Sequence, residues 1–144
     1  MNEFDARTCD PLLLSETLRK STKADEESLD VALAGVGLSA TRWAALRSLA
    51  EAGDQMPLSR IAEMLSCARS NATQLVDRLE AGGLLIRVTD PDDRRSVSAR
   101  LTGEGRNRYA AGLDIMREYE RSLLGDYTPE ERLLLWKLLN RLGG

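Results

Sequence analysis

A run of polar side chains stands at the start of one expected helix, over residues 69–81. Its members are Arg69, Ser70, Asn71, Thr73 and Gln74. Asn and Gln can bind adenine through two hydrogen bonds, Arg can bind guanine in the same way, and Ser or Thr can bind a base edge or a phosphate. A plain solvated face is the alternative, although such faces are usually richer in Lys and Glu. The run therefore favours a helix that enters the DNA major groove by its N-terminal end.

A charged turn, DPDDRR at residues 90–95, is the second candidate. It separates two expected strands, over residues 84–89 and 96–101, and its composition is typical of a hairpin tip. Two arginines beside aspartates that hold them extended suit the narrow minor groove, where negative potential is concentrated. A generic charged turn is the alternative.

Two short amphipathic helices must position these groups. Pro57 suits the first turn of the first helix, whose buried face is expected to be Leu58, Ile61, Ala62 and Leu65. Residues 66–68 are expected to form the turn between them. The second helix is expected to bury Ala72, Leu75, Val76 and Leu79 and to end at Gly82-Gly83. Helix, turn, helix and hairpin, in this order, indicate a winged helix-turn-helix.

The two expected strands differ in pattern. Residues 96–101 alternate between apolar and polar side chains, which is typical of a strand with one buried face. Residues 84–89 are more continuously apolar, so we expect this strand to be better covered.

The preceding chain is expected to form two helices. Apolar residues at spacings of three and four predict one long helix over residues 12–34, with a polar middle at 21–28. A surface helix with a loop at 21–28 is the alternative. Gly35 and Gly37 break this helix, and Ser39 caps the next one, which Gly53 ends. We interpret Trp43 as a core residue rather than as the wall of a ligand site.

The C-terminal third is expected to form two further helices. Thr102 caps one over residues 103–125, and Thr128, Pro129 and Glu131 form a capping box for the last. The last helix is too apolar for exposure to water, since it carries Leu133, Leu134, Leu135, Trp136, Leu138, Leu139 and Leu142. We infer a dimer interface made by the first and the last two helices. A monomer would have to fold this surface against its own first helix.

Composition excludes several classes of function. The 144 residues carry 20 basic and 23 acidic side chains, and the stretch 57–106 is only slightly basic, with 8 against 7. There is no histidine, and Cys9 and Cys67 have no partner at metal-ligand spacing, so we expect no metal site, no cofactor and no enzyme. No apolar run could span a bilayer, and the N-terminus is polar, so we expect a cytoplasmic protein without membrane contact.

These observations predict a mainly α fold with a small β-hairpin wing, in one compact chain. Residues 1–37 would form an N-terminal dimerisation helix, residues 38–105 a winged helix-turn-helix DNA-binding lobe, and residues 106–144 the C-terminal dimerisation helices. A winged helix that contacts only proteins is the alternative function. A small enzyme is the other, although the sequence has neither a phosphate-binding loop nor a nucleophile elbow.

Spaced motifs between residues 38 and 105 resemble the multiple-antibiotic-resistance regulator (MarR) family, and the resemblance extends over roughly residues 12–142, with residues 75–105 as its specific part. They are LS at 38–39, RW at 42–43, IAE at 61–63, LVDRLE at 75–80, GL at 83–84, DPDDRR at 90–95 and LTGEG at 101–105. The resemblance implies a homodimeric transcription factor, usually a repressor, that binds a palindromic operator. It also implies a small-molecule effector pocket between the DNA-binding lobe and the dimer helices.

The resemblance also implies roles for individual residues. Arg95 becomes the leading minor-groove residue, Asp93 its orienting partner and Arg94 a close second, and Arg78 joins the DNA-binding set. Leu14, Leu18 and Trp43 become candidate walls of the effector pocket. For the mechanism we expect a hinge at Gly35 to Gly37 or at Gly103 to Gly105, along which an effector changes the separation of the two lobes.

The sequence departs from the family at two places. Ala68 stands where a capping Ser is frequent, which costs the recognition helix roughly 1 kcal/mol. The organic-hydroperoxide sensors of the family use a cysteine within the first helix, whereas Cys9 precedes that helix. Cys67, at the head of the recognition helix, is the other candidate for oxidation, and an unremarkable thiol is the alternative for both.

Overall fold

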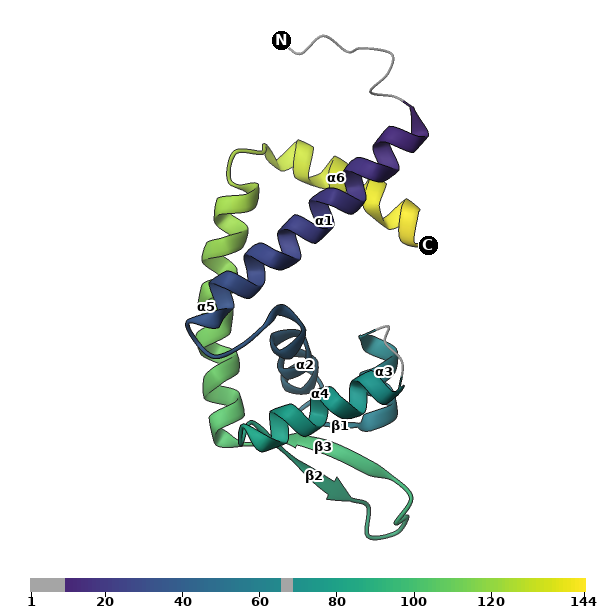
Figure 1. Cartoon of the computed structure of the whole chain (residues 1–144), viewed down its shortest axis with the longest axis vertical. Helices are drawn as coiled ribbons and strands as arrows, with labels where there is room; N and C mark the ends of the chain where they lie inside the picture. The colour runs from purple at the N-terminus through teal and green to yellow at the C-terminus, as the bar shows by residue number, and fades with distance from the viewer. Residues whose placement is uncertain (1–9, 66–68) are drawn as a thin grey trace.

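The computed structural model describes residues 10–65 and 69–144, which form six helices and three strands. Figure 1 shows a compact lobe of short elements at one end and α1 and α6 crossing at the other, with α5 running along one side between them. The elements are α1 (Pro11–Ala34), α2 (Ala40–Glu51), β1 (Gln55–Pro57), α3 (Leu58–Met64), α4 (Arg69–Ala81), β2 (Leu85–Thr89), β3 (Val97–Leu101), α5 (Gly103–Leu124) and α6 (Pro129–Gly143).

Local capping signals define the starts of three helices, as the sequence predicts. The hydroxyl of Ser39 accepts from the third backbone N–H of α2 at 3.2 Å, and that of Thr102 does the same for α5 at 3.0 Å. At α6 the capping box is complete. The hydroxyl of Thr128 accepts from Glu131 N at 3.2 Å, and the carboxylate of Glu131 accepts from Thr128 N at 2.8 Å.

The first helix is continuous through its polar middle. It runs over 24 residues, so the alternative of a loop near residues 21–28 is wrong. The helix ends at a turn in which Gly37 adopts a φ of 70°, a conformation that glycine adopts without steric cost. Arg108 of α5 donates from Nη1 to the carbonyl oxygen of Val36 at 2.9 Å and so holds this turn against α5.

The wing belongs to a three-stranded antiparallel sheet in the order β1-β3-β2, rather than to an isolated hairpin. Nothing in the sequence pattern indicates β1, which pairs Met56 with Ala99 and Pro57 with Ser98. Pro57 was expected within the first turn of α3. Instead it ends β1 and takes the N-cap position of α3. The central strand β3 is therefore held from both sides.

The core lies between α2, α4 and the sheet. Its largest fully buried side chains are Leu33, Leu46, Leu49, Ile61, Leu79, Leu85 and Val76. The predicted alternation of β3 is confirmed, since Ala99 and Leu101 are buried and Arg100 is exposed. The expectation that β2 is the better covered strand is wrong, because Ile86 is 41% exposed on the outer face of the sheet.

Two buried glycines fit α5 tightly to the lobe. A Cβ on Gly105 would overlap the carbonyl oxygen of Leu84, and a Cβ on Gly112 would overlap the indole of Trp43. Trp43 also donates from Nε1 to the carbonyl oxygen of Tyr109 at 3.4 Å and stacks on its ring. Gly105 therefore allows the first turn of α5 to approach the main chain of Leu84 closely.

Candidate nucleic-acid interface

The helix α4 presents one buried stripe and an exposed polar surface. Ala72, Val76 and Leu79 are buried as predicted, and Leu75 is half-buried. Four of the predicted DNA-binding side chains on α4 are exposed, namely Asn71, Thr73, Gln74 and Arg78. The backbone of Arg69 and Ser70 belongs to α4, whereas their side chains lie outside the described part of the structure. The expected turn at 66–68, with Cys67 and Ala68, lies outside the described residues, and so does Cys9.

One flank of α4 faces the start of α2 across a groove of about 280 Å³, here called the α2 groove. It is lined by Asn71, Gln74 and Arg78 of α4, by Leu75, and by Ser39, Thr41 and Arg42. The structure thus brings three predicted residues together. Thr41 and Arg42 were not predicted to belong to this surface, although two polar residues in the first turn of a helix next to the recognition helix could have indicated it.

The opposite flank of α4 faces the wing across a groove of about 450 Å³, here called the wing groove. Thr73 lines it from α4, Asp93 and Arg95 line it from the wing, and Ser59 lines it from α3. The predicted helix residues and the predicted wing residues therefore meet at one surface. Ser59 carried no signal in the sequence, because only the closure of the wing over α3 brings it there.

The wing tip is shaped by its aspartates through the backbone. Asp90 accepts from the N–H of Asp92 at 2.9 Å, and Asp93 accepts from the N–H of Arg95 at 3.0 Å. Asp93 thus positions Arg95 by holding its main chain and leaves the guanidinium available. Arg94 and Arg95 are both exposed, and only Arg95 lines the wing groove.

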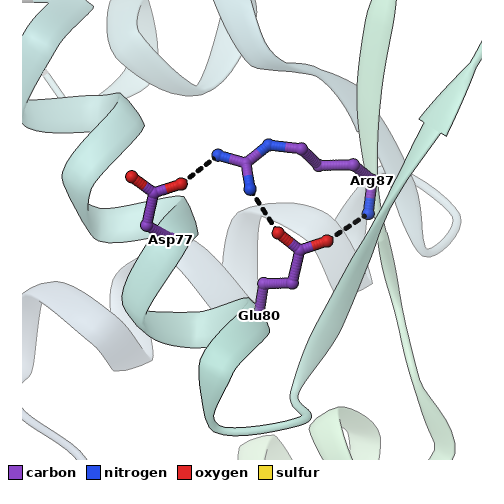
Figure 2. A network of polar contacts seen from close by, with 3 residues as sticks. All are labelled: Asp77, Glu80 and Arg87. Atoms are coloured by element: carbon purple, nitrogen blue, oxygen red, sulfur yellow. Dashed lines mark hydrogen bonds and ion pairs between the residues drawn. The ribbon is translucent and has the colours of Figure 1, made fainter.

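A three-residue network joins β2 to α4, as Figure 2 shows. Arg87 binds Asp77 through Nη2 at 2.5 Å and Glu80 through Nη1, and its backbone N–H donates to Glu80 Oε1 at 3.2 Å. The hydrogen bond with Asp77 is the main cause that raises the pKa of Arg87 above its ordinary value, against the opposing effect of desolvation. This network was not predicted, because nothing in the sequence of a strand indicates which helix its arginine will contact.

The three candidate effector residues do not come together. Leu14 and Leu18 line a mainly apolar groove of about 780 Å³ between α1, α5 and α6, here called the helix groove, which also includes Leu134, Leu135 and Leu138. Trp43 is only 5% exposed and packs in the core against α5. The interpretation of Trp43 as a core residue is confirmed, and its role as a pocket wall has no support in this geometry.

Within residues 10–65 and 69–144, no cluster of three or more Cys, Asp or Glu residues could hold a metal ion. No helix in these ranges is long and apolar enough to cross a membrane.

Comparison with known proteins identifies relatives of this chain and its family. The model of the MarR family matches residues 38–97, which include α2, the helices α3 and α4, and most of the wing. The HTH-type transcriptional regulator PecS of Dickeya dadantii (strain 3937) is 32% identical over 143 residues. That alignment covers 98% of this chain and 86% of PecS.

Two solved structures share the fold. The organohalide-sensing transcriptional regulator RdhR-CbdbA1625, in its 2,4-dichlorophenol-bound form, has a TM-score of 0.86 at 24% identity, over 99% of this chain and 83% of that one. A mutant MarR from E. coli, complexed with operator DNA, has a TM-score of 0.84 at 20% identity, over 96% and 98%. With the extended similarity to PecS, these findings show that the chain belongs to the MarR family of transcriptional regulators.

Proposed function

We propose that this protein is a ligand-responsive repressor that binds a palindromic operator as a homodimer. The observation that carries the proposal is the wing groove, because it sets Thr73 of α4 and Arg95 of the wing on one surface. A helix in the major groove with an arginine beside it in the minor groove is a sequence-reading geometry. The similarity in fold to a MarR bound to operator DNA supports the same docking.

Each predicted residue has a role in this proposal. Asn71 and Gln74 read base edges, together with Arg69 and Ser70 at the start of α4. Thr73 and Arg78 bind phosphates on the two flanks, and Arg95 enters the minor groove. Arg94 adds a second cation at the tip, and Asp93 orients the main chain of Arg95.

A second copy of the chain covers the apolar surface of the terminal helices. In the single chain α6 buries no side chain, and its seven large apolar residues are between 42% and 71% exposed. Such a surface is too large to face water in a stable monomer. We therefore assign residues 1–37 and 106–144 to dimerisation and residues 38–105 to DNA. In the dimer the two recognition helices must lie about 34–36 Å apart to reach successive major grooves.

The effector acts on the separation of the two lobes. A small molecule shifts DNA binding only by the difference between its affinities for the two dimer conformations. The helix groove, with Leu14 and Leu18, is the candidate site, and its apolar lining fits an aromatic or aliphatic effector. The 2,4-dichlorophenol bound by RdhR-CbdbA1625 belongs to this chemical class. The protein acts in the cytoplasm and performs no catalysis.

Footprinting tests the proposal directly. The full chain is titrated at low salt against fragments of the genome that encodes it, and the retained fragments are probed with a nuclease. We expect a protected site with two-fold symmetry. If no sequence is protected even at low salt, the winged helix is instead a protein-contact module.

Sedimentation tests the dimer. Leu138→Glu places a charge on the apolar surface of α6 and should shift the chain from dimer to monomer. Lys137→Gln, on the same helix, is the matched control and should sediment like the unmodified protein. A monomeric unmodified protein would refute the homodimer.

A further inference from the structure

We infer that Arg87 is a positioning residue of the DNA interface. By clamping β2 to the recognition helix, it sets the place of the wing relative to α4, so that Arg95 reaches the minor groove while α4 occupies the major groove. This inference rests on the proposed function and adds a residue that itself contacts no DNA. It concerns the coupling between the major-groove contact of α4 and the minor-groove contact of Arg95.

The clamp lies on the flank of α4 that faces the wing. Thr73, Asp77 and Glu80 follow at intervals of four and three, so they share one side of the helix. Thr73, at the start of this row, lines the wing groove together with Arg95. Asp77 and Glu80, further along the row, hold Arg87 (Figure 2). The clamp and the wing groove are thus successive parts of one helix–wing contact.

The geometry of the clamp restricts movement in more than one direction. Asp77 holds Nη2 of the guanidinium, and Glu80 holds both Nη1 and the main-chain N–H of Arg87. A planar guanidinium that is bound on two sides orients its partners, whereas a lysine ammonium would act as a point charge. Because the carboxylate of Glu80 also accepts from the main-chain N–H of Arg87, the position of β2 itself is fixed.

The strand register carries this restraint to the wing tip. Arg87 pairs with Ala99 in the ladder, and the next pairs are Val88 with Ser98 and Thr89 with Val97. The tip follows at once, closed by a hydrogen bond from Asp90 N to the carbonyl oxygen of Ser96 at 3.1 Å. A rotation of β2 about its base would therefore displace the tip and Arg95 with it.

Charge is the competing explanation. Arg87 is 28% exposed, and it neutralises two carboxylates beside the proposed DNA surface. Removing it would leave Asp77 and Glu80 uncompensated, and they would repel phosphates whatever the position of the wing. A loss of affinity in one Arg87 variant cannot separate the two effects, so the test must measure coupling to Arg95.

A double-mutant cycle measures that coupling. Operator affinity is determined for the unmodified protein, Arg87→Met, Arg95→Ala and the double variant at one salt concentration. If Arg87 positions the wing, Arg95→Ala weakens binding about tenfold in the unmodified protein and less than about twofold in the Arg87→Met background. Equal losses in the two backgrounds overturn the inference.

A triple variant removes the charge explanation. Arg87→Met combined with Asp77→Asn and Glu80→Gln leaves no uncompensated carboxylate at the clamp. We expect that the effect of Arg95→Ala stays below about twofold in this background, because the wing is still released. Recovery of the full tenfold effect would show that Arg87 acts by neutralisation and would overturn the inference.

Arg106 provides the matched control for stability. It forms an ion pair at 2.7 Å with Asp54, which ties α5 to the turn before β1, away from the wing tip. Arg106→Met should lower the melting temperature and leave the tenfold effect of Arg95→Ala intact. If Arg87→Met does not fold, Arg87→Lys replaces it, and a full Arg95 effect in that background counts against the inference. An unmodified protein that binds no operator refutes the proposed function itself, and this inference with it.

Discussion

The Cα of Gly105 packs directly against the main-chain carbonyl of Leu84. The same carbonyl oxygen accepts a hydrogen bond from Thr102 N at 3.1 Å. The first turn of α5 is thereby fixed to the residue that precedes β2, and no space remains for a Cβ. The lobe and α5 consequently meet through main chain as well as through side chains.

Gly105→Ala should lower the free energy of unfolding by about 1–3 kcal/mol, the usual cost of overpacking a core. The added methyl group can be accommodated only if main chain moves. Gly103→Ala is the matched control, because nothing lies within 4 Å of a Cβ at that position of the same helix. Urea unfolding of both variants checks this. Equal stabilities would contradict the tight contact at Gly105.

Arg95→Ala should weaken operator binding and reduce the slope of log affinity against log salt by about one. Without this cation in the minor groove, binding releases one fewer counterion from the DNA. Arg121→Ala removes an exposed arginine at the far end of α5 and should change neither quantity. Fluorescence anisotropy at several salt concentrations gives both slopes. An unchanged slope for Arg95→Ala would exclude it as a groove contact.

Gln74→Ala should relax the preference for one base pair without changing nonspecific binding. The amide of Gln74 is exposed on α4 beside Asn71, where two hydrogen bonds to one base are within its chemistry. The discrimination lost should be about 1–3 kcal/mol at that position. Competition among operators with single base-pair changes measures it. A uniform loss on every sequence would make Gln74 a phosphate contact.

Tyr119→Phe should lose its destabilising effect at alkaline pH. Tyr119 donates to Asp25 Oδ1 at 2.6 Å between α5 and α1, and this hydrogen bond is the main reason why the pKa of Tyr119 is raised above its ordinary value. The fold favours the protonated phenol, so the bond stabilises fully below the unfolded pKa of about 10 and is lost as pH rises through the folded pKa.

Urea unfolding of the unmodified protein and of Tyr119→Phe, at about pH 8 and about pH 11, measures this difference. We expect Tyr119→Phe to be the less stable protein at the lower pH and the difference to be smaller at the higher pH. If the difference in unfolding free energy is the same at both pH values, the hydrogen bond from the Tyr119 hydroxyl does not contribute to stability.

The sequence predicted best those features that are determined within a few residues. Ser39, Thr102 and Thr128 each cap a helix through a bond to a backbone N–H three positions on, so the motif contains its own partner. The buried stripe of α4 was predictable for the same reason, because Ala72, Val76 and Leu79 need only helical periodicity to share a face.

Features that depend on distant partners were missed. The strand β1 has three residues, and it exists because they pair with β3 more than forty positions later. Arg87 is an ordinary strand residue until the hairpin packs on α4 and meets Asp77 and Glu80. The sequence is compatible with two roles for Trp43, core residue and pocket wall, and its burial against Gly112 and Tyr109 of α5 distinguishes them.

The apolar surface of α6 makes the stability of this protein depend on how much of it is present. Because α6 buries no side chain within one chain, the free energy that secures it in the proposed dimer comes from association and follows mass action. Its melting temperature should therefore rise with protein concentration. A cell with few copies would hold chains whose terminal helices are open to proteases, so a low abundance would itself shorten the lifetime of the repressor.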